Sequence, residues 1–164
     1  MAAGDRLNGN QVDVAFGAGA IASLAAPTAA EAGALTPIEC AIVDGPATPQ
    51  SGSTIDLTAL CDTSSRQKAG LLTNNPITIT LFREPNTTDP EWVLFDPATT
   101  GSQHLLIARG GWATTDTPTL ADKCEAYEVE VMKRESSTPV NNEASRFMVE
   151  LAVISVEQDA VIAA

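Results

Sequence analysis

Apolar and polar residues alternate along much of the second half of the chain. In residues 77–83, Ile77, Ile79 and Leu81 fall on one face, and Thr78 and Thr80 fall on the other. Successive side chains of a strand point to opposite faces, so this period of two predicts a half-buried strand. β-Branched residues, which favour strands, are frequent in the same stretches. We predict strands over residues 35–43, 54–61, 77–83, 104–109, 127–134 and 147–156.

Helical signals are few and short. Asp89 is a suitable N-cap, and it is followed by Pro90 at the first helical position and Glu91 in the first turn. Pro97 must end this helix soon afterwards. Residues 28–31 have the form of a capping box and predict a short helical turn. The fold class predicted is therefore mainly β, an antiparallel β-sandwich or barrel with one short flanking helix.

The last predicted strand is apolar on both faces. One face carries Phe147, Val149, Leu151 and Val153. The other face carries Met148, Glu150, Ala152 and Ile154. The second face is too apolar for free solvent, which suggests that it meets a neighbouring subunit. The candidate subunit-interface residues are Met148, Ala152, Ile154 and Val156.

The beginning of the chain has a different composition. Residues 1–34 are rich in Ala and Gly, and we expect them to contribute little to a core. We predict that residues 1–25 form an N-terminal arm, flexible or ordered on assembly, and that residues 26–164 form one domain.

Charge and cysteine content narrow the function classes. The net charge is −12 with only 9 basic residues among 164, which disfavours specific nucleic-acid binding. Such acidity suits a surface that DNA passes without binding, and it also suits ordinary solubility. No run approaches the ~20 apolar residues of a membrane span, so we expect a soluble product of the cytoplasm. Cys40, Cys61 and Cys124, odd in number and widely spaced, are expected to be small buried side chains in a reducing compartment.

Candidate chemistry is weak. Gly17, Gly19 and Ala22 match a dinucleotide fingerprint, with Asp44 as a possible ribose ligand, but Pro27 interrupts the helix that the motif requires. The lone His104 sits beside an apolar run, and nothing supports pairing it with a nucleophile. We therefore expect no enzyme, no cofactor and no metal site.

Two carboxylates on one strand fit a solvated or lumen-facing surface better than an acid/base pair. Glu128 and Glu130 lie two residues apart, so they share a strand face. They are the candidate lumen-facing acidic residues.

A series of short motifs in a fixed order resembles a known family. The motifs are residues 26–31, 60–62, 77–82, 89–98, 105–110, 125–130 and 146–149. In their order and spacing the chain is similar to the major tail tube proteins of long, non-contractile-tailed (siphovirus-type) bacteriophages, especially those of actinobacterial hosts.

This resemblance implies a structural virion protein made in the host cytoplasm. Six copies would form a ring, strands of neighbouring subunits would continue into a closed lumenal sheet, and rings would stack into a tube that conducts the genome during ejection. Loop or terminal arms would bridge successive rings. The implied partners are other copies, the tape measure, tail terminator and distal tail proteins, and passing DNA without specific binding, with no membrane. The alternatives are another virion component, such as a tail terminator or head decoration protein, or a small dinucleotide-binding protein.

Overall fold

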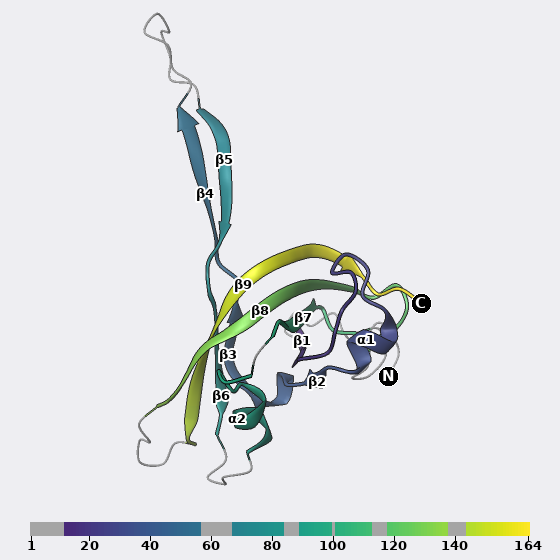
Figure 1. Cartoon of the computed structure of the whole chain (residues 1–164), viewed down its shortest axis with the longest axis vertical. Coiled ribbons are helices and arrows are strands. Elements are labelled where there is room, and N and C mark those ends of the chain that lie inside the picture. The colour runs from purple at the N-terminus through teal and green to yellow at the C-terminus, as the bar shows by residue number, and fades with distance from the viewer. Residues whose placement is uncertain (1–11, 57–66, 84–88, 100, 113–117, 138–143) are drawn as a thin grey trace, which may run out of the picture.

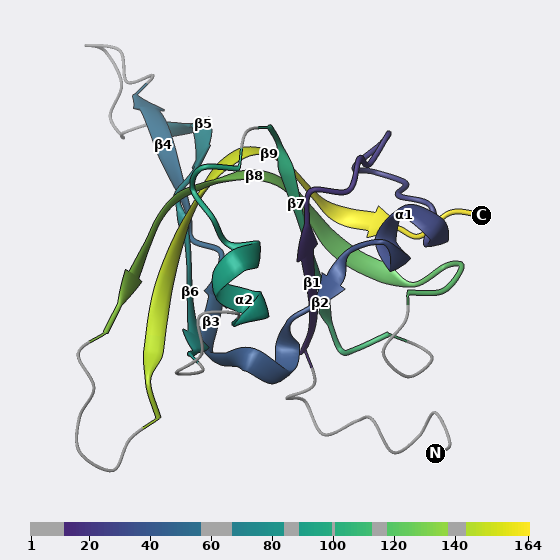
Figure 2. The ribbon, with the colours of Figure 1, turned by 60° about the horizontal axis from the view of Figure 1, so that its bottom comes forward.

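The protein is mainly β. The computed structural model describes residues 12–56, 67–83, 89–99, 101–112, 118–137 and 144–164. Seven strands form one antiparallel sheet in the order β2-β1-β7-β8-β9-β6-β3. Figures 1 and 2 show this sheet curled into a half-barrel. Its strands are β1 (Val12–Gly17), β2 (Thr36–Pro37), β3 (Ile42–Ala47), β6 (Ile77–Phe82), β7 (Gln103–Arg109), β8 (Lys123–Ser136) and β9 (Arg146–Val161).

One short connection spans the open side of the curl. The edge strands β2 and β3 lie at opposite ends of the sheet order, yet only the 3-10 turn Glu39–Ala41 and its flanking residues separate them in sequence. Ile38, next to this turn, is buried in the main core, and its amide donates to Val14 O at 2.8 Å. The single strand predicted over residues 35–43 is therefore wrong, because the chain here must cross from one sheet edge to the other.

A two-stranded hairpin stands apart from the sheet. It consists of β4 (Gln50–Asp56) and β5 (Gln67–Asn74), and Figure 1 shows it projecting away from the body. The prediction of a strand at residues 54–61 is met only at its beginning, and residues 57–61 lie outside the described part. Residues 67–74 form a strand that was not among the predicted ones.

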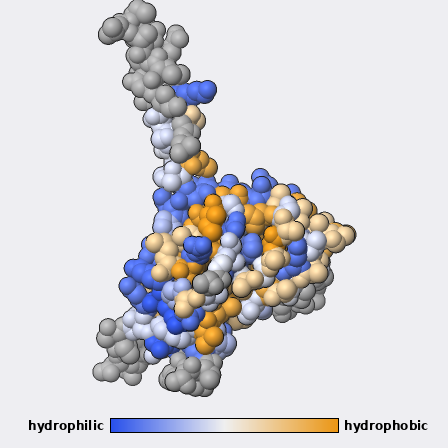
Figure 3. Space-filling model, in the orientation of Figure 1, coloured by the Kyte–Doolittle hydropathy of each residue, from blue (hydrophilic) through white to orange (hydrophobic). Residues whose placement is uncertain are grey.

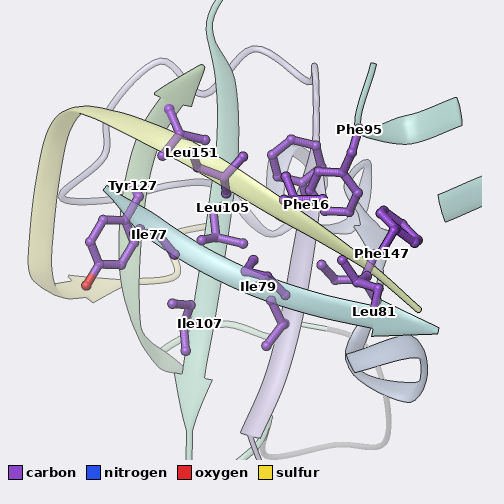
Figure 4. Close-up of a cluster of buried hydrophobic side chains, with 14 residues drawn as sticks. Phe16, Ile77, Ile79, Leu81, Phe95, Leu105, Ile107, Tyr127, Phe147 and Leu151 are labelled. Atoms are coloured by element: carbon purple, nitrogen blue, oxygen red, sulfur yellow. The ribbon is translucent and has the colours of Figure 1, made fainter. Parts of the chain in front are cut away.

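The concave side of the sheet holds the main core. Ile77, Ile79 and Leu81 of β6 are buried there, as the alternation predicted. The rings of Phe16 and Phe95 stack with centroids 4.3 Å apart. Figure 4 shows both rings beside the aliphatic side chains of this cluster. Since Val14 and Phe16 of β1 belong to it, the expectation that residues 1–34 contribute little to the core is wrong.

The helix α2 (Pro90–Leu94) lies inside the curl (Figure 2). Asp89 is its N-cap as predicted, since its carboxylate accepts from Trp92 N at 3.0 Å. Two guanidinium groups lie over the Trp92 ring, with Cζ of Arg83 4.1 Å and Cζ of Arg134 4.3 Å from the ring centroid. Arg134 also donates to Trp92 O. These contacts, from Arg83 directly after β6 and from Arg134 in β8, fix the helix against the sheet.

A second cluster covers part of the convex side. Leu106, Ala108 and Ala126 of the sheet pack with Leu35 and Ala32, which belong to or follow α1 (Ala29–Gly33). The predicted capping box is confirmed, because Thr28 N donates to Glu31 Oε2 at 2.8 Å and Glu31 N donates to Thr28 Oγ1 at 3.2 Å. The described part of the chain therefore has two short α-helices, where one flanking helix was predicted.

The Glu31 carboxylate should make α1 sensitive to acid. Its hydrogen bonds from the backbone of Thr28 and Ala22 lower its pKa below the ordinary value of 4.5. The stabilisation is present above the unfolded-state pKa and is lost as pH falls through the folded one. We expect the melting temperature of wild type to exceed that of Glu31→Gln near neutral pH, and the two to converge in acid. Thermal unfolding from pH 3 to pH 7 measures this, and a constant difference across the range would contradict it.

Candidate assembly surface

The two longest strands form a curved antiparallel ribbon that crosses the whole molecule (Figure 1). Tyr127 and Val129 of β8 point into the concave core, so Glu128 and Glu130 point to the convex side. In the β8–β9 register Glu130 lies opposite Ala152, and Glu135 lies opposite Met148. The predicted lumen-facing acids therefore share one sheet face with Met148 and Ala152, two of the predicted interface residues.

Hydrogen bonds hold Glu128 in its charged form. Bonds from Ser102 and Ser155 lower the pKa of this carboxyl, and Ser155 Oγ lies 3.0 Å from Glu128 Oε2. Glu130 is exposed on the same face. The convex side of the ribbon consequently carries negative charge at neutral pH.

A β-bulge in β9 reverses the face of the sheet to which the side chains directly after it point. Val129 pairs with Val153 but Glu128 pairs with Ser155, so Ile154 is an extra residue in β9. Beyond it Val156 pairs with Tyr127 and packs, partly buried, against the concave core. Regular alternation places Val156 with Ala152, whereas the bulge moves it to the opposite side. Ile154 itself is 51% exposed.

Each strand of the ribbon has one unpaired edge segment. Strand β7 pairs with β8 only as far as Val129, and no described strand continues along residues 130–136 on that side. Strand β6 pairs with β9 only as far as Leu151. The described residues place no strand beside residues 152–160 on that side, and the edge is next contacted where Val161 N donates to Ala25 O. We call these segments the β8 free edge and the β9 free edge.

Both free edges carry an exposed apolar side chain at a bulge. Met132 is the extra residue of β8, since Val131 pairs with Leu151 and Lys133 with Glu150. Its side chain is 53% exposed, close to the value for Ile154 on the other edge. Figure 3 shows apolar patches scattered among polar residues over the body of the molecule. Met132 was not among the residues predicted from the sequence, because only register reveals a bulge.

The residues considered for catalysis are not brought together. His104 is buried in β7 and lies opposite Glu128, four residues along β8 from Cys124, which corresponds to about 13 Å. The Gly17 motif leads from β1 into residues 18–27, which form neither helix nor strand. It lacks the helix N-terminus that would bind a pyrophosphate. Cys124 is buried, with a pKa raised to about 11 chiefly by desolvation, whereas Cys40 is exposed, contrary to expectation, and Cys61 lies outside the described residues.

Other ligand sites find little support in the described structure. Among these residues no group of three or more His, Cys, Asp or Glu side chains is placed to hold a metal ion. Two surface depressions have volumes of about 150 and 220 Å³. Both are smaller than the roughly 300–1,000 Å³ of typical ligand pockets. None of the described helices is long and apolar enough to cross a membrane.

The curled sheet has a counterpart among solved structures. A chain in a structure described as the cryo-EM structure of the anti-feeding prophage (AFP) baseplate, 6-fold symmetrised, is similar with a TM-score of 0.62. The alignment covers 92% of this chain and 93% of that one at 9% identity, so it shows a shared fold. The curled sheet with its exposed ribbon is thus a fold of the phage-tail type.

The family assignment comes from the sequence. Residues 1–164 match the family described as phage tail tube protein, and the chain belongs to that family. No curated protein matches the sequence. The family makes the chain a structural component of a virion tail, for which a non-enzymatic role is expected.

Proposed function

We propose that this protein assembles into hexameric rings that stack into a tail tube and conduct the genome during ejection. The observation that carries the proposal is the β8–β9 ribbon, whose two unpaired edges face different directions within a tail tube family member. Pairing these edges between subunits in a closed ring removes exposed sheet edges that would otherwise pair with further chains in an uncontrolled way. The baseplate that contains the similar chain is described as 6-fold symmetrised, which supports a ring of six.

The convex side of the ribbon is the proposed lumenal wall. Glu128 and Glu130 would present negative charge to the passing DNA, which would repel phosphate and prevent binding. Met148 and Ala152 share this face, so we assign them to the margin of the wall near a neighbouring subunit. Ile154 remains a proposed contact residue. Val156 would instead contribute to the packing of the subunit's own core.

The hairpin β4–β5 is the proposed contact between successive rings. It has few contacts with the half-barrel and projects beyond it (Figure 1), as a bridging arm must. An N-terminal arm is a second proposed bridge. Because Val12–Gly17 already form a strand of the sheet, paired with β2 and β7, such an arm could involve only residues on either side of β1.

The remaining assignments concern the biological setting. We propose a siphovirus-type tail, a host among the actinobacteria, and synthesis in the host cytoplasm. The partners would be the tape measure, tail terminator and distal tail proteins. These proposals rest on the motif order along residues 26–149 and on membership of the family.

Electron microscopy of the purified protein at increasing concentration tests the function. We expect sixfold rings and, at high concentration or on a tail-tip complex, stacked tubes with a central channel. A single ring that never stacks would instead favour a tail terminator. A protein that stays monomeric at high concentration and is absent from virions would overturn the proposal.

A further inference from the structure

The two free edges differ in charge, because the β8 free edge carries two basic and two acidic residues, whereas the β9 free edge carries Glu157 and Asp159 and no basic residue. We propose that Lys133 on the β8 free edge of one copy pairs with Glu157 on the β9 free edge of the next, fixing the order and register of the subunit junction. The inference rests on the proposed function and adds to it the contact that orients neighbouring copies.

The geometry of the ribbon permits this junction. The β8 free edge is the part of β8 that continues past the end of its pairing with β7. The β9 free edge is the part of β9 that continues past the end of its pairing with β6. The two segments therefore lie diagonally across the ribbon, one on each side. A second copy, rotated and displaced along the strands, can place its β9 free edge against the β8 free edge of the first. The new pair is antiparallel, like every other pair in the sheet, and the displacement is the stagger that a closed sheet of tilted strands requires.

Lys133 and Glu157 lie on the same side of such a sheet. Lys133 pairs with Glu150, which alternates with the buried Val149 and Leu151, so both charged residues are convex. Glu157 pairs with Ala126, which belongs to the convex cluster. If Lys133 stands opposite Glu157, residues 130–136 lie along residues 154–160, and both segments fall wholly within the free edges.

Both side chains are available for a new partner. Lys133 is 47% exposed, and its ion pairs with Glu135 and Glu150 are each 3.4 Å long. Such exposed pairs contribute little and exchange readily. Among the described residues no basic side chain forms an ion pair with Glu157. Asp159, two residues further on and exposed, adds negative charge to the same edge.

Charges and bulges on an edge also have a protective role, since they discourage pairing between sheets. That role predicts no particular partner for either charge. The proposed pairing instead requires opposite charges on the two edges. Reversing the charge on one edge should therefore weaken assembly, and reversing the charge on the other edge of the neighbouring copy should restore it.

The experiment compares Lys133→Glu, Glu157→Lys and their equimolar mixture, by sedimentation velocity and negative-stain microscopy at low and high salt. Each single variant should show roughly tenfold less assembled protein than wild type, because like charges oppose each other at every junction. The mixture should recover assembly, since alternating copies restore opposite charges at every junction of a ring with an even number of subunits. Lys123→Glu, on β8 but outside the free edge, is the matched control and should assemble normally.

Circular dichroism and thermal unfolding of each variant separate misfolding from lost assembly. Single variants that assemble like wild type, or a mixture of folded variants that does not recover, would overturn the pairing while the tube function stands. A wild-type protein that forms no rings under any condition would overturn the function and the pairing together.

Discussion

Truncation of Phe16 to alanine is expected to lower the free energy of unfolding by about 3–5 kcal/mol. The side chain is fully buried and stacks on Phe95, which follows α2. Its loss leaves a cavity between β1 and the segment inside the curl, which the surrounding strands can fill only in part. Domain stability is commonly about 5–15 kcal/mol, so this change removes a large share of it. Urea unfolding followed by tryptophan fluorescence and circular dichroism measures the effect.

Phe82→Ala is the matched control. This phenylalanine is 44% exposed and lies on the opposite face of β6 from the buried Leu81. Its truncation removes the same atoms from a site already in contact with water, so we expect a loss of about 1 kcal/mol or less. Equal losses from the two variants would contradict the place of β1 in the core, and would return residues 12–17 to the proposed arm.

The second large effect is expected at Asp13. Its carboxylate is buried, and Oδ2 accepts a hydrogen bond from Trp112 N at 2.7 Å. Asp13 lies on β1 and Trp112 follows β7, so the bond fixes the loop after β7 against the sheet. Asp13→Ala removes this acceptor from a buried N–H, which should cost about 1–3 kcal/mol. Thermal and chemical unfolding at neutral pH measures this loss.

Asp13→Asn separates the hydrogen bond from the charge. The amide oxygen of asparagine keeps an acceptor of the same shape, so this variant should be more stable than Asp13→Ala. If both substitutions leave stability unchanged, the bond to Trp112 does not hold the loop. If both are equally damaging, the negative charge rather than the acceptor carries the effect.

The structure also explains why some residues of the candidate surface were predictable. Glu128 and Glu130 could be placed on one face because the strand around them is regular and its period is two. Met148 and Ala152 precede the bulge in β9 and therefore keep the facing that alternation assigns. Val156 follows the bulge, and a single extra residue reverses the facing of the residues after it, as far as the next register shift between Glu157 and Ala160.

The role of the N-terminal segment in the core, by contrast, was not predicted from the sequence. Ala and Gly dominate its composition, and that average hid the alternation of Val12, Val14 and Phe16 with Asp13 and Ala15. The strand is short and both of its faces are buried, so this alternation lacks the exposed polar positions that mark a half-buried strand. Its partner β7 lies nearly 90 residues away, and only long-range pairing shows that it belongs to the sheet.

By itself the sequence determined the local features, because they depend on residues close together along the chain. It specified the caps at Thr28 and Asp89, the alternation of β6 and the central part of β8, and the net charge of −12. Only the tertiary structure decided the strand order, the bulges at Met132 and Ile154 and the two free edges. These depend on which distant strand lies beside each segment and where that strand ends, and backbone pairing of this kind leaves almost no trace in local composition.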